Sequence, residues 1–246
     1  MMTDKPVIAC MRAHRSIRRF AEEELADDVL RKAVAAAQMA ATSSNIQAYS
    51  VLRVRDPERR EQLAELCGGQ SQVAKSGAFL VLSADVRRHL LAAEAKETAN
   101  EQNLESFLQA LIDASLFGQN LALALESLGY GVCYIGGLRN QLTKVDELLA
   151  LPRGVWPLFG LCVGRPAEEP GLRPRLRPEA VLFDEQYPSD DEIRADIAEY
   201  DDRMASYYEE RGKPGYDWSR GLVRVFARKR REHLESFYKS KGASFD

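Results

Sequence analysis

The segment from His14 to Phe20, HRSIRRF, contains the side chains in this sequence best suited to bind an anionic ligand. Three arginines and a histidine surround one serine, so the segment can present guanidinium groups and a hydroxyl to a phosphate monoester. Ile17 and Phe20 would anchor it in the core. A solvated basic surface is the alternative, and the segment alone does not decide between the two.

Two other segments could line a flat ligand. Thr42, Ser43 and Ser44 follow a predicted helix, where their hydroxyls would either contact a ligand or form the turn that ends the helix. The sequence YIGG at 134–137 ends an apolar run. Paired glycines let backbone amides approach a planar ligand, because no Cβ intervenes, but a tight turn explains them equally well.

Arginine clusters also occur late in the chain. Arg173 and Arg175 flank a proline that stiffens the backbone, so they form either a second phosphate clamp or an exposed linker. The run RKRR at 228–231 could contact nucleic acid, but it lies on a predicted amphipathic helix without interleaved aromatic residues. We therefore expect a solvated helix face there.

Several common motifs are absent from the sequence. It has no G-x-G-x-x-G after a strand, no G-x-x-x-x-G-K-[ST] and no G-x-S-x-G, which disfavours Rossmann dinucleotide binding, NTP hydrolysis and acyl transfer. The three histidines are too widely spaced for a zinc site, so we expect no metal. The four cysteines form no CxxC pair and predict reduced, mostly buried thiols in a cytoplasmic protein.

The overall composition is that of an ordinary globular protein. Of 246 residues, 45% are hydrophobic and 29% charged, and the net charge of −3 gives no general affinity for nucleic acid or anionic membranes. No apolar run reaches the roughly 20 residues that a membrane span needs. We expect neither nucleic acid nor a membrane as a partner.

The elements that must position the candidate residues are helices and short strands. Residue patterns predict helices over 25–40, 57–67, 142–149, 190–211 and 218–238. Short apolar runs predict strands over 48–55, 78–84, 132–135 and 156–163. The arm at 165–177 holds three prolines and four arginines without periodicity. We therefore expect an α+β core over 1–164 and an extended arm with a helical extension over 165–246.

The longest predicted helix, over 104–128, is apolar nearly all round. Its only charge between Ser106 and Leu125 is Asp113. This pattern is typical of a helix buried on most sides, in a core or a subunit interface.

The order and spacing of these segments resemble the oxygen-insensitive NADPH nitroreductases and NADPH–flavin oxidoreductases of the nitroreductase-fold superfamily. The matching segments are HRSIRRF at 14–20, the hydroxyls near 43, GGQ at 68–70, YIGGLRN at 134–140, LFGLCVGRP at 158–166 and RPRL at 173–176. The resemblance implies an α+β sandwich with a central, mostly antiparallel sheet flanked by helices, and an intertwined homodimer with FMN in two interface clefts. Its extension would pack on the core and on the partner subunit.

The resemblance also implies which residues bind the cofactors. FMN would be held by His14, Arg15, Ser16, Ile17, Arg18, Thr42, Ser43, Ser44, Gln70, Gln72, Tyr134, Ile135, Gly136, Gly137, Arg173 and Arg175. Among these, Arg18 would approach the pyrimidine edge of the flavin. Arg211 would bind the NADPH 2′-phosphate, and Arg139 and Arg231 would lie near the substrate mouth. No side chain need be catalytic, because the flavin carries the chemistry.

The implied activity is reduction of small planar acceptors by NADPH. Electrons would pass two at a time, in a ping-pong cycle, to nitroaromatics, quinones or free flavin. A specialised flavin enzyme or dehalogenase of the same superfamily is an alternative, and a nucleic-acid-binding protein using the arginine clusters is another. Flavin absorbance bleached by NADPH would indicate the enzyme, whereas a colourless protein with salt-sensitive DNA affinity would indicate the binder.

Overall fold

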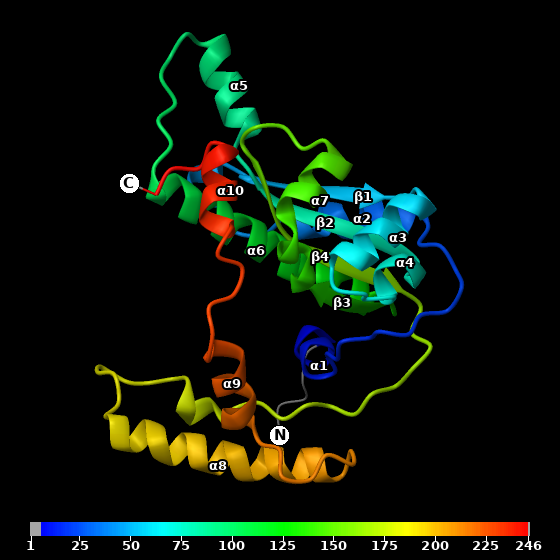
Figure 1. Ribbon diagram of the computed structural model, residues 1–246, viewed down its shortest axis with the longest axis vertical. Coiled ribbons are helices and arrows are strands. Elements are labelled where there is room, and N and C mark those ends of the chain that lie inside the picture. The colour runs from blue at the N-terminus through cyan, green and yellow to red at the C-terminus, as the bar shows by residue number, and fades with distance from the viewer. Residues whose placement is uncertain (1–5, 246) are drawn as a thin grey trace. The chain divides into compact units, whose positions relative to one another are not determined.

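The computed structural model describes residues 6–245 and divides them into two compact units. The larger unit runs to Pro170 and includes the residues from Arg231 onward, while the smaller unit is Gly171–Arg230. The last helix of the chain, labelled α10 in Figure 1, therefore belongs to the larger unit.

A four-stranded sheet in the order β1-β2-β4-β3 forms the centre of the larger unit, and every pair of neighbouring strands is antiparallel. This confirms the α+β fold with an antiparallel sheet. All residues of β2 are buried, and nearly all of β4 are, because both strands are central and covered on both faces. The strands are β1 (Tyr49–Val54), β2 (Ala78–Asp85), β3 (Gly131–Ile135) and β4 (Val155–Gly164).

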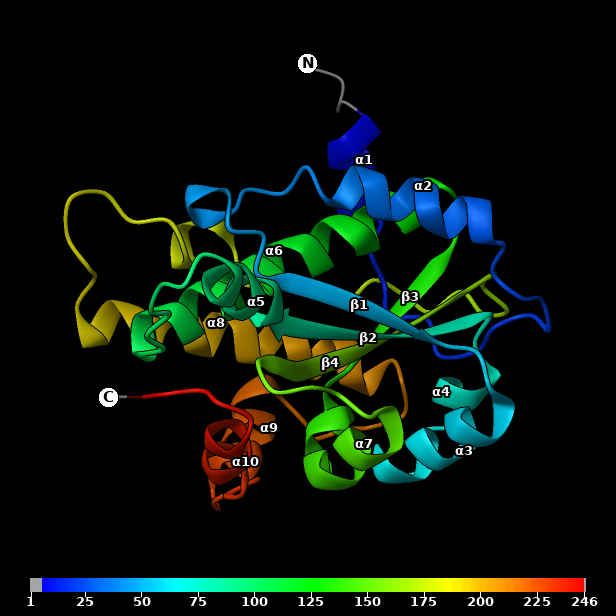
Figure 2. The same ribbon diagram turned by 90° about the horizontal axis from the view of Figure 1, so that it is seen from above.

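Helices cover both faces of the sheet (Figure 2), because successive side chains of a strand point to opposite faces. Leu80 and Leu82 of β2 pack with the helices α2 (Asp27–Ala37) and α6 (Leu104–Ser127), on what we call the α6 face. Phe79 and Val81 pack with residues of α3 (Pro57–Leu66), on what we call the α3 face. Also on the α3 face are residues of α4 (Gln72–Lys75), the 3-10 helix η2 (Gly136–Asn140) and α7 (Leu142–Leu149).

Helix α6 is buried on one side and exposed on the other. Leu104, Leu108, Ile112 and Leu116 are 43%, 39%, 54% and 43% exposed, and their spacing of four residues aligns them in one stripe. By length and composition alone α6 could span a membrane, but its other side packs on the sheet and buries the charged Asp113. We call these four residues the α6 stripe.

Several short elements of the larger unit were not predicted. Helices α1 (Pro6–Arg12) and α5 (Arg87–Ala95) are short and bury none of their residues. The 3-10 helix η1 (Ser43–Asn45) is too short to show any period.

The smaller unit holds helices α8 (Asp190–Glu209) and α9 (Trp218–Phe226) and the 3-10 helix η3 (Pro178–Ala180). Ser189 and Glu192 form a capping box that begins α8, and Tyr200 contacts the ring of Trp218. As predicted, residues 165–177 contain no helix, and their only strand-like pairing is an isolated bridge at Pro166.

The single basic helix predicted over 218–238 is wrong. The chain leaves the helix after Phe226 and resumes as α10 (Leu234–Ser240). Between these two helices, Arg228–Arg231 form a run of four cations that contains no apolar residue to bury. Phe237 and Tyr238 of α10 are buried in the core of the larger unit, so packing restarts the helix there.

Candidate functional site

The HRSIRRF segment lies beside the beginning of β3. Ser16 forms a parallel bridge with Val132, and the Ile17 amide donates to the Val132 carbonyl at 2.9 Å. Ile17 is 4% exposed and packs so tightly on Gly131 that a Cβ there would collide with its side chain. Ile17 thus anchors the segment as expected, and β3 leads from this anchor to the glycine pair.

The glycine pair at the end of β3 meets the GGQ motif on the α3 face. A Cβ on Gly137 would collide with the carbonyl of Cys67 and with Nε2 of Gln70. That Nε2 donates to the Cys67 carbonyl at 2.8 Å, and Nε2 of Gln72 donates to Oε1 of Gln70 at 3.1 Å. Two motifs that are far apart in the sequence therefore form one cluster.

Gly136, by contrast, makes no tight contact on the side where a Cβ would stand. A Cβ built there comes no closer than 3.5 Å to any atom outside its neighbours, and the nearest atom is Nη2 of Arg139. The backbone at Gly136 is consequently accessible to a flat ligand, while that at Gly137 is fixed by its contacts.

Next to the glycine pair, Tyr134 and Ile135 offer their backbone rather than their side chains. The Tyr134 hydroxyl donates to the Gly118 carbonyl of α6 at 2.8 Å, and burial raises the pKa of this phenol above its usual value. Ile135 is fully buried in the core. The Tyr134 hydroxyl is thus engaged elsewhere, and the Ile135 side chain is out of reach of a ligand.

Three basic side chains of the HRSIRRF segment, those of His14, Arg15 and Arg19, pair with a carboxylate. His14 Nδ1 donates to Glu126 Oε1 at 2.7 Å. Arg15 Nη1 lies 3.3 Å from Glu169, whose side chain is 89% exposed. Ion pairs this exposed contribute little stability, so the Arg15 guanidinium can exchange Glu169 for a phosphate.

Glu168 fixes the backbone of the same segment. Its Oε1 accepts from the amides of Arg18 and Arg19 at 2.5 and 3.0 Å, and its Oε2 accepts from the Arg19 side chain at 3.1 Å. The hydrogen bond from the Arg18 amide is the largest cause that lowers the pKa of Glu168. Nothing in the sequence pattern pointed to this residue.

Arg18 also lies close to β3. Burial raises the pKa of the Cys133 thiol, and the positive charge of Arg18 opposes that rise. The positive charge of Arg18 therefore acts on this thiol of β3.

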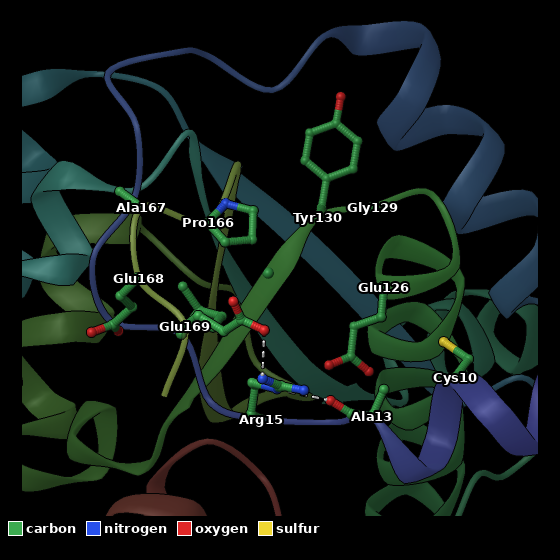
Figure 3. Close-up of a pocket in the computed structure, with 12 residues that line it drawn as sticks. Cys10, Ala13, Arg15, Glu126, Gly129, Tyr130, Pro166, Ala167, Glu168 and Glu169 are labelled. Carbon is green, nitrogen blue, oxygen red and sulfur yellow. Dashed lines mark hydrogen bonds and ion pairs between the residues drawn. The ribbon is translucent and has the colours of Figure 1, made fainter. Parts of the chain in front are cut away.

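A pocket of about 630 Å³ opens where this segment passes the beginning of β3 (Figure 3). Arg15 and Ile17 line it, with the carboxylates Glu126, Glu168 and Glu169. It reaches Gly131 at one end of β3 and does not include the glycine pair at the other.

The hydroxyls Thr42, Ser43 and Ser44 lie elsewhere. They belong to the loop from Thr42 to Ala48, which we call the hydroxyl loop and which hydrogen-bonds to Asp113 of α6. It precedes β1, whereas α3 and α4 lie beyond the end of that strand (Figure 2). Within one chain, Gln70 therefore lies with the glycine pair on the α3 face, whereas the three hydroxyl residues lie beside α6.

Arg139 and Arg231 both lie at η2, next to the glycine pair. Arg139 donates to the Leu158 carbonyl. Arg231 donates through Nε and Nη2 to Oδ1 of Asn140, at 3.1 and 2.9 Å. Two cations of the larger unit thus flank the end of β3.

Arg173, Arg175 and Arg211 belong to the smaller unit. Arg175 donates to the Arg173 carbonyl at 3.0 Å, and Arg211 stacks over the Tyr207 ring at 5.1 Å. Nη1 of Arg211 also lies 3.6 Å from a Cβ built on Gly171, two residues before Arg173. The three arginines are exposed and gather in one part of this unit.

Comparison with known proteins gives matches over almost the whole chain. Residues 11–165 match the model of the nitroreductase family, and residues 173–246 match that of its C-terminal domain. A Bacillus subtilis protein named FMN reductase (NADPH) is 44% identical over 93% of this chain and 94% of its own length. An oxygen-insensitive NADPH nitroreductase of Salmonella typhimurium is 39% identical, over 96% and 98%. The structure of a B. subtilis nitroreductase superposes with a TM-score of 0.93 at 42% identity, covering 96% and 98%.

Proposed function

The chain belongs to the nitroreductase family and is an NAD(P)H-dependent flavoprotein oxidoreductase, and from this premise we propose that FMN binds between the HRSIRRF segment and the glycine pair at the end of β3. The observation that carries the proposal is the pairing of Ser16 with β3, because that strand leads directly to Gly136 and Gly137.

The residues at this place fit FMN. The phosphate needs cations and donors, which His14, Arg15 and Ser16 supply on one segment. The flat ring needs backbone that it can approach, which Gly136 supplies because a Cβ built there meets nothing within 3.4 Å. Arg173 and Arg175 are proposed to complete the phosphate clamp.

The chemistry that FMN would supply when bound is the transfer of two electrons from NADPH to the acceptor. The protein's residues would bind the cofactor and place charge beside its ring. Arg18 would face the pyrimidine edge, where a fixed cation stabilises negative charge. Gln70, held by the Cys67 carbonyl and by Gln72, would present its amide to the ring. The Tyr134 phenol donates to the Gly118 carbonyl, and we propose that the proton of the reaction comes from solvent.

We propose that the active protein is a homodimer with one FMN in each of two clefts between subunits. Two observations support this. The α6 stripe exposes four large apolar side chains in a row, a pattern that a second copy could cover. The hydroxyl loop is hydrogen-bonded to α6 and lies away from the glycine pair of the same chain. The hydroxyls that contact the flavin would therefore have to come from the hydroxyl loop of a second subunit.

NADPH is the proposed reductant, in keeping with the names of both relatives. Arg211 would bind its 2′-phosphate, with Arg139 and Arg231 near the mouth of the site. Nitroaromatics and free flavin are the acceptors that the relatives' names suggest, and we extend the proposal to quinones and to a ping-pong cycle. The three buried thiols, none in a disulfide, agree with a cytoplasmic protein.

A spectrum of the purified protein tests the proposal. We expect flavin absorbance that NADPH bleaches in the absence of oxygen. Arg18→Ala should lose FMN and slow reduction, while Arg31→Ala, an exposed arginine on α2, should change neither. A variant at Arg18 that stayed yellow and equally fast would show that the pyrimidine-edge role is wrong.

The two alternatives have weaker support. The whole-chain similarity to an FMN reductase and to a nitroreductase favours reduction of flavin or nitroaromatics over dehalogenation. A colourless protein whose DNA affinity falls steeply with salt would instead indicate nucleic-acid binding through Arg228–Arg231.

A further inference from the structure

Asp113 is a buried carboxylate that accepts hydrogen bonds from the hydroxyl loop. It is 1% exposed and accepts from Thr42 Oγ1 at 2.5 Å, from the Ser43 amide at 3.3 Å and from the Ala48 amide at 3.0 Å. A buried carboxylate is costly unless donors compensate it. Here the donors come from the loop, so the helix and the loop stabilise each other.

The hydroxyl loop needs such an anchor because its backbone is strained. Ser44, Asn45 and Gln47 have φ values of 46°, 58° and 49°, in the left-handed region that side chains other than glycine rarely adopt. Such residues persist only where the surrounding structure holds them, and they concentrate at functional sites. A second contact from outside the loop comes from His89, whose Nε2 donates to the Ile46 carbonyl at 2.7 Å.

The Thr42 hydroxyl links Asp113 to the other end of the hydroxyl loop. It donates to Asp113 and accepts from the Gln47 amide at 2.8 Å, so the same group closes both ends of the strained stretch. Its single O–H donor is used by Asp113, so the Thr42 hydroxyl has no proton left to donate to a ligand. Ser43 and Ser44 keep exposed side chains and remain available to a ligand.

We propose that Asp113 is a positioning residue for flavin binding. It holds the hydroxyl loop in its left-handed conformation, and thereby sets where Ser43 and Ser44 meet FMN. Asp113 directly follows Ile112 of the α6 stripe, so the loop is fixed relative to the surface proposed to contact a second copy. The inference rests on the proposed FMN site and adds a residue that itself does not touch the cofactor.

The first experiment separates positioning from stability. In Asp113→Asn the side-chain shape is kept, but one of the three donors loses its acceptor because an amide offers a single oxygen. We expect FMN to bind at least about tenfold more weakly to the apoprotein, measured by quenching of flavin fluorescence. Leu121→Ala, a fully buried residue of the same helix, should lower Tm yet leave the FMN Kd within about twofold. Equal FMN affinity in Asp113→Asn and wild type would overturn the proposal.

The second experiment asks whether Asp113 acts through the two serines. In a Ser43→Ala/Ser44→Ala background, Asp113→Asn should weaken FMN binding no further, although it should still lower Tm. The full tenfold loss in that background would show that Asp113 acts by another route, which overturns the proposal. An unchanged FMN Kd in the Ser43→Ala/Ser44→Ala protein would overturn it as well, because the serines would then not contact the flavin.

These outcomes remain distinct from failure of the proposed function. If the wild-type protein binds no FMN at all, the proposed flavin site is wrong. If it binds FMN normally but Asp113→Asn and the two serine substitutions weaken binding additively, only the proposed role of Asp113 is wrong. If Asp113→Asn does not fold, Thr42→Val replaces it in both experiments, since it deletes the shortest of the three hydrogen bonds and leaves the carboxylate in place.

Discussion

Gln70 and Gly137 are in direct contact on the α3 face of the sheet, so closely that a single methyl group on the glycine would overlap the amide of the glutamine. Gln70 follows α3, and Gly137 follows β3. Their contact therefore fixes the end of β3 against a helix pair, and it leaves Gly136 as the accessible glycine of the two.

Substitution of Gly137 should lower stability, whereas substitution of Gly136 should weaken FMN binding. Gly137→Ala is expected to lower stability by about 1–3 kcal/mol, because its methyl group collides with the Cys67 carbonyl. Gly136→Ala should leave Tm nearly unchanged, because in the free protein its methyl group makes only an ordinary contact with Arg139 Nη2 at 3.5 Å, and it should weaken FMN binding by roughly tenfold, because it would meet an approaching ligand. Thermal denaturation of the apoproteins and FMN titration measure the two effects. Unchanged FMN affinity in a stable Gly136→Ala variant would place the flavin elsewhere.

Arg211 should determine the preference for NADPH. Loss of its charged hydrogen bonds to a 2′-phosphate, at about 1.5–3 kcal/mol, corresponds to a roughly ten- to hundredfold rise in KM for NADPH in Arg211→Ala. KM for NADH should not change. Arg194→Ala, an exposed arginine on α8, serves as the control. Nearly equal efficiency of the wild-type enzyme with NADPH and NADH would refute the assignment before any variant is made.

The α6 stripe should be required for dimerisation. Ile112 is the most exposed of its four residues, and Ile112→Glu would place a charge in the proposed interface, where an unpaired charge is costly. We expect the mass in solution, measured by light scattering, to fall from that of a dimer to that of a monomer, with loss of FMN. Gln62→Glu adds the same charge on the exposed side of α3 and should stay dimeric. A dimeric Ile112→Glu variant would point to a different interface.

Glu168 should make stability depend on pH below about 4.5. Its folded pKa is lowered, first by the hydrogen bond from the Arg18 amide, so its ionised form stabilises the fold above the unfolded pKa of about 4.3. That contribution is lost as the pH falls through the folded pKa. Glu168→Gln should therefore have a lower Tm than wild type at pH 7, and the gap should narrow as the pH approaches 3. With Glu61→Gln, an exposed position, we expect no such gap. A gap that stayed constant down to pH 3 would contradict this account.

Hydrophobic patterns alone predicted most of the regular elements. The runs that form β2 and β4 are unbroken because both faces of these strands are covered, and the helix α7 has the predicted bounds, Leu142–Leu149. The short helix α5, which buries none of its residues, was missed. The helix predicted over 218–238 is wrong because its pattern does not show that the helix ends at Phe226, before the cationic run, and that a new helix begins at Leu234.

The site was less accessible to sequence reasoning. The residue types of the HRSIRRF segment indicated phosphate chemistry and predicted Ile17 as an anchor, and the structure added that Ile17 packs against Gly131. The contact of Gln70 with Gly137 depends on how a helix and a strand end pack, which no local pattern encodes. Asp113 did leave a signal, as the single charge in an apolar helix, whereas Glu168 in the aperiodic arm left none.

The return of the chain to the larger unit after Arg230 means that the smaller unit is an insertion, attached at Pro170 and again at Arg231. A protease that cuts once between residues 226 and 234 would leave the smaller unit covalently joined through its other end. The released C-terminal piece would still be held by Phe237 and Tyr238, whose side chains are buried in the core. A nicked molecule should therefore keep its native mass in solution while showing two fragments after denaturation.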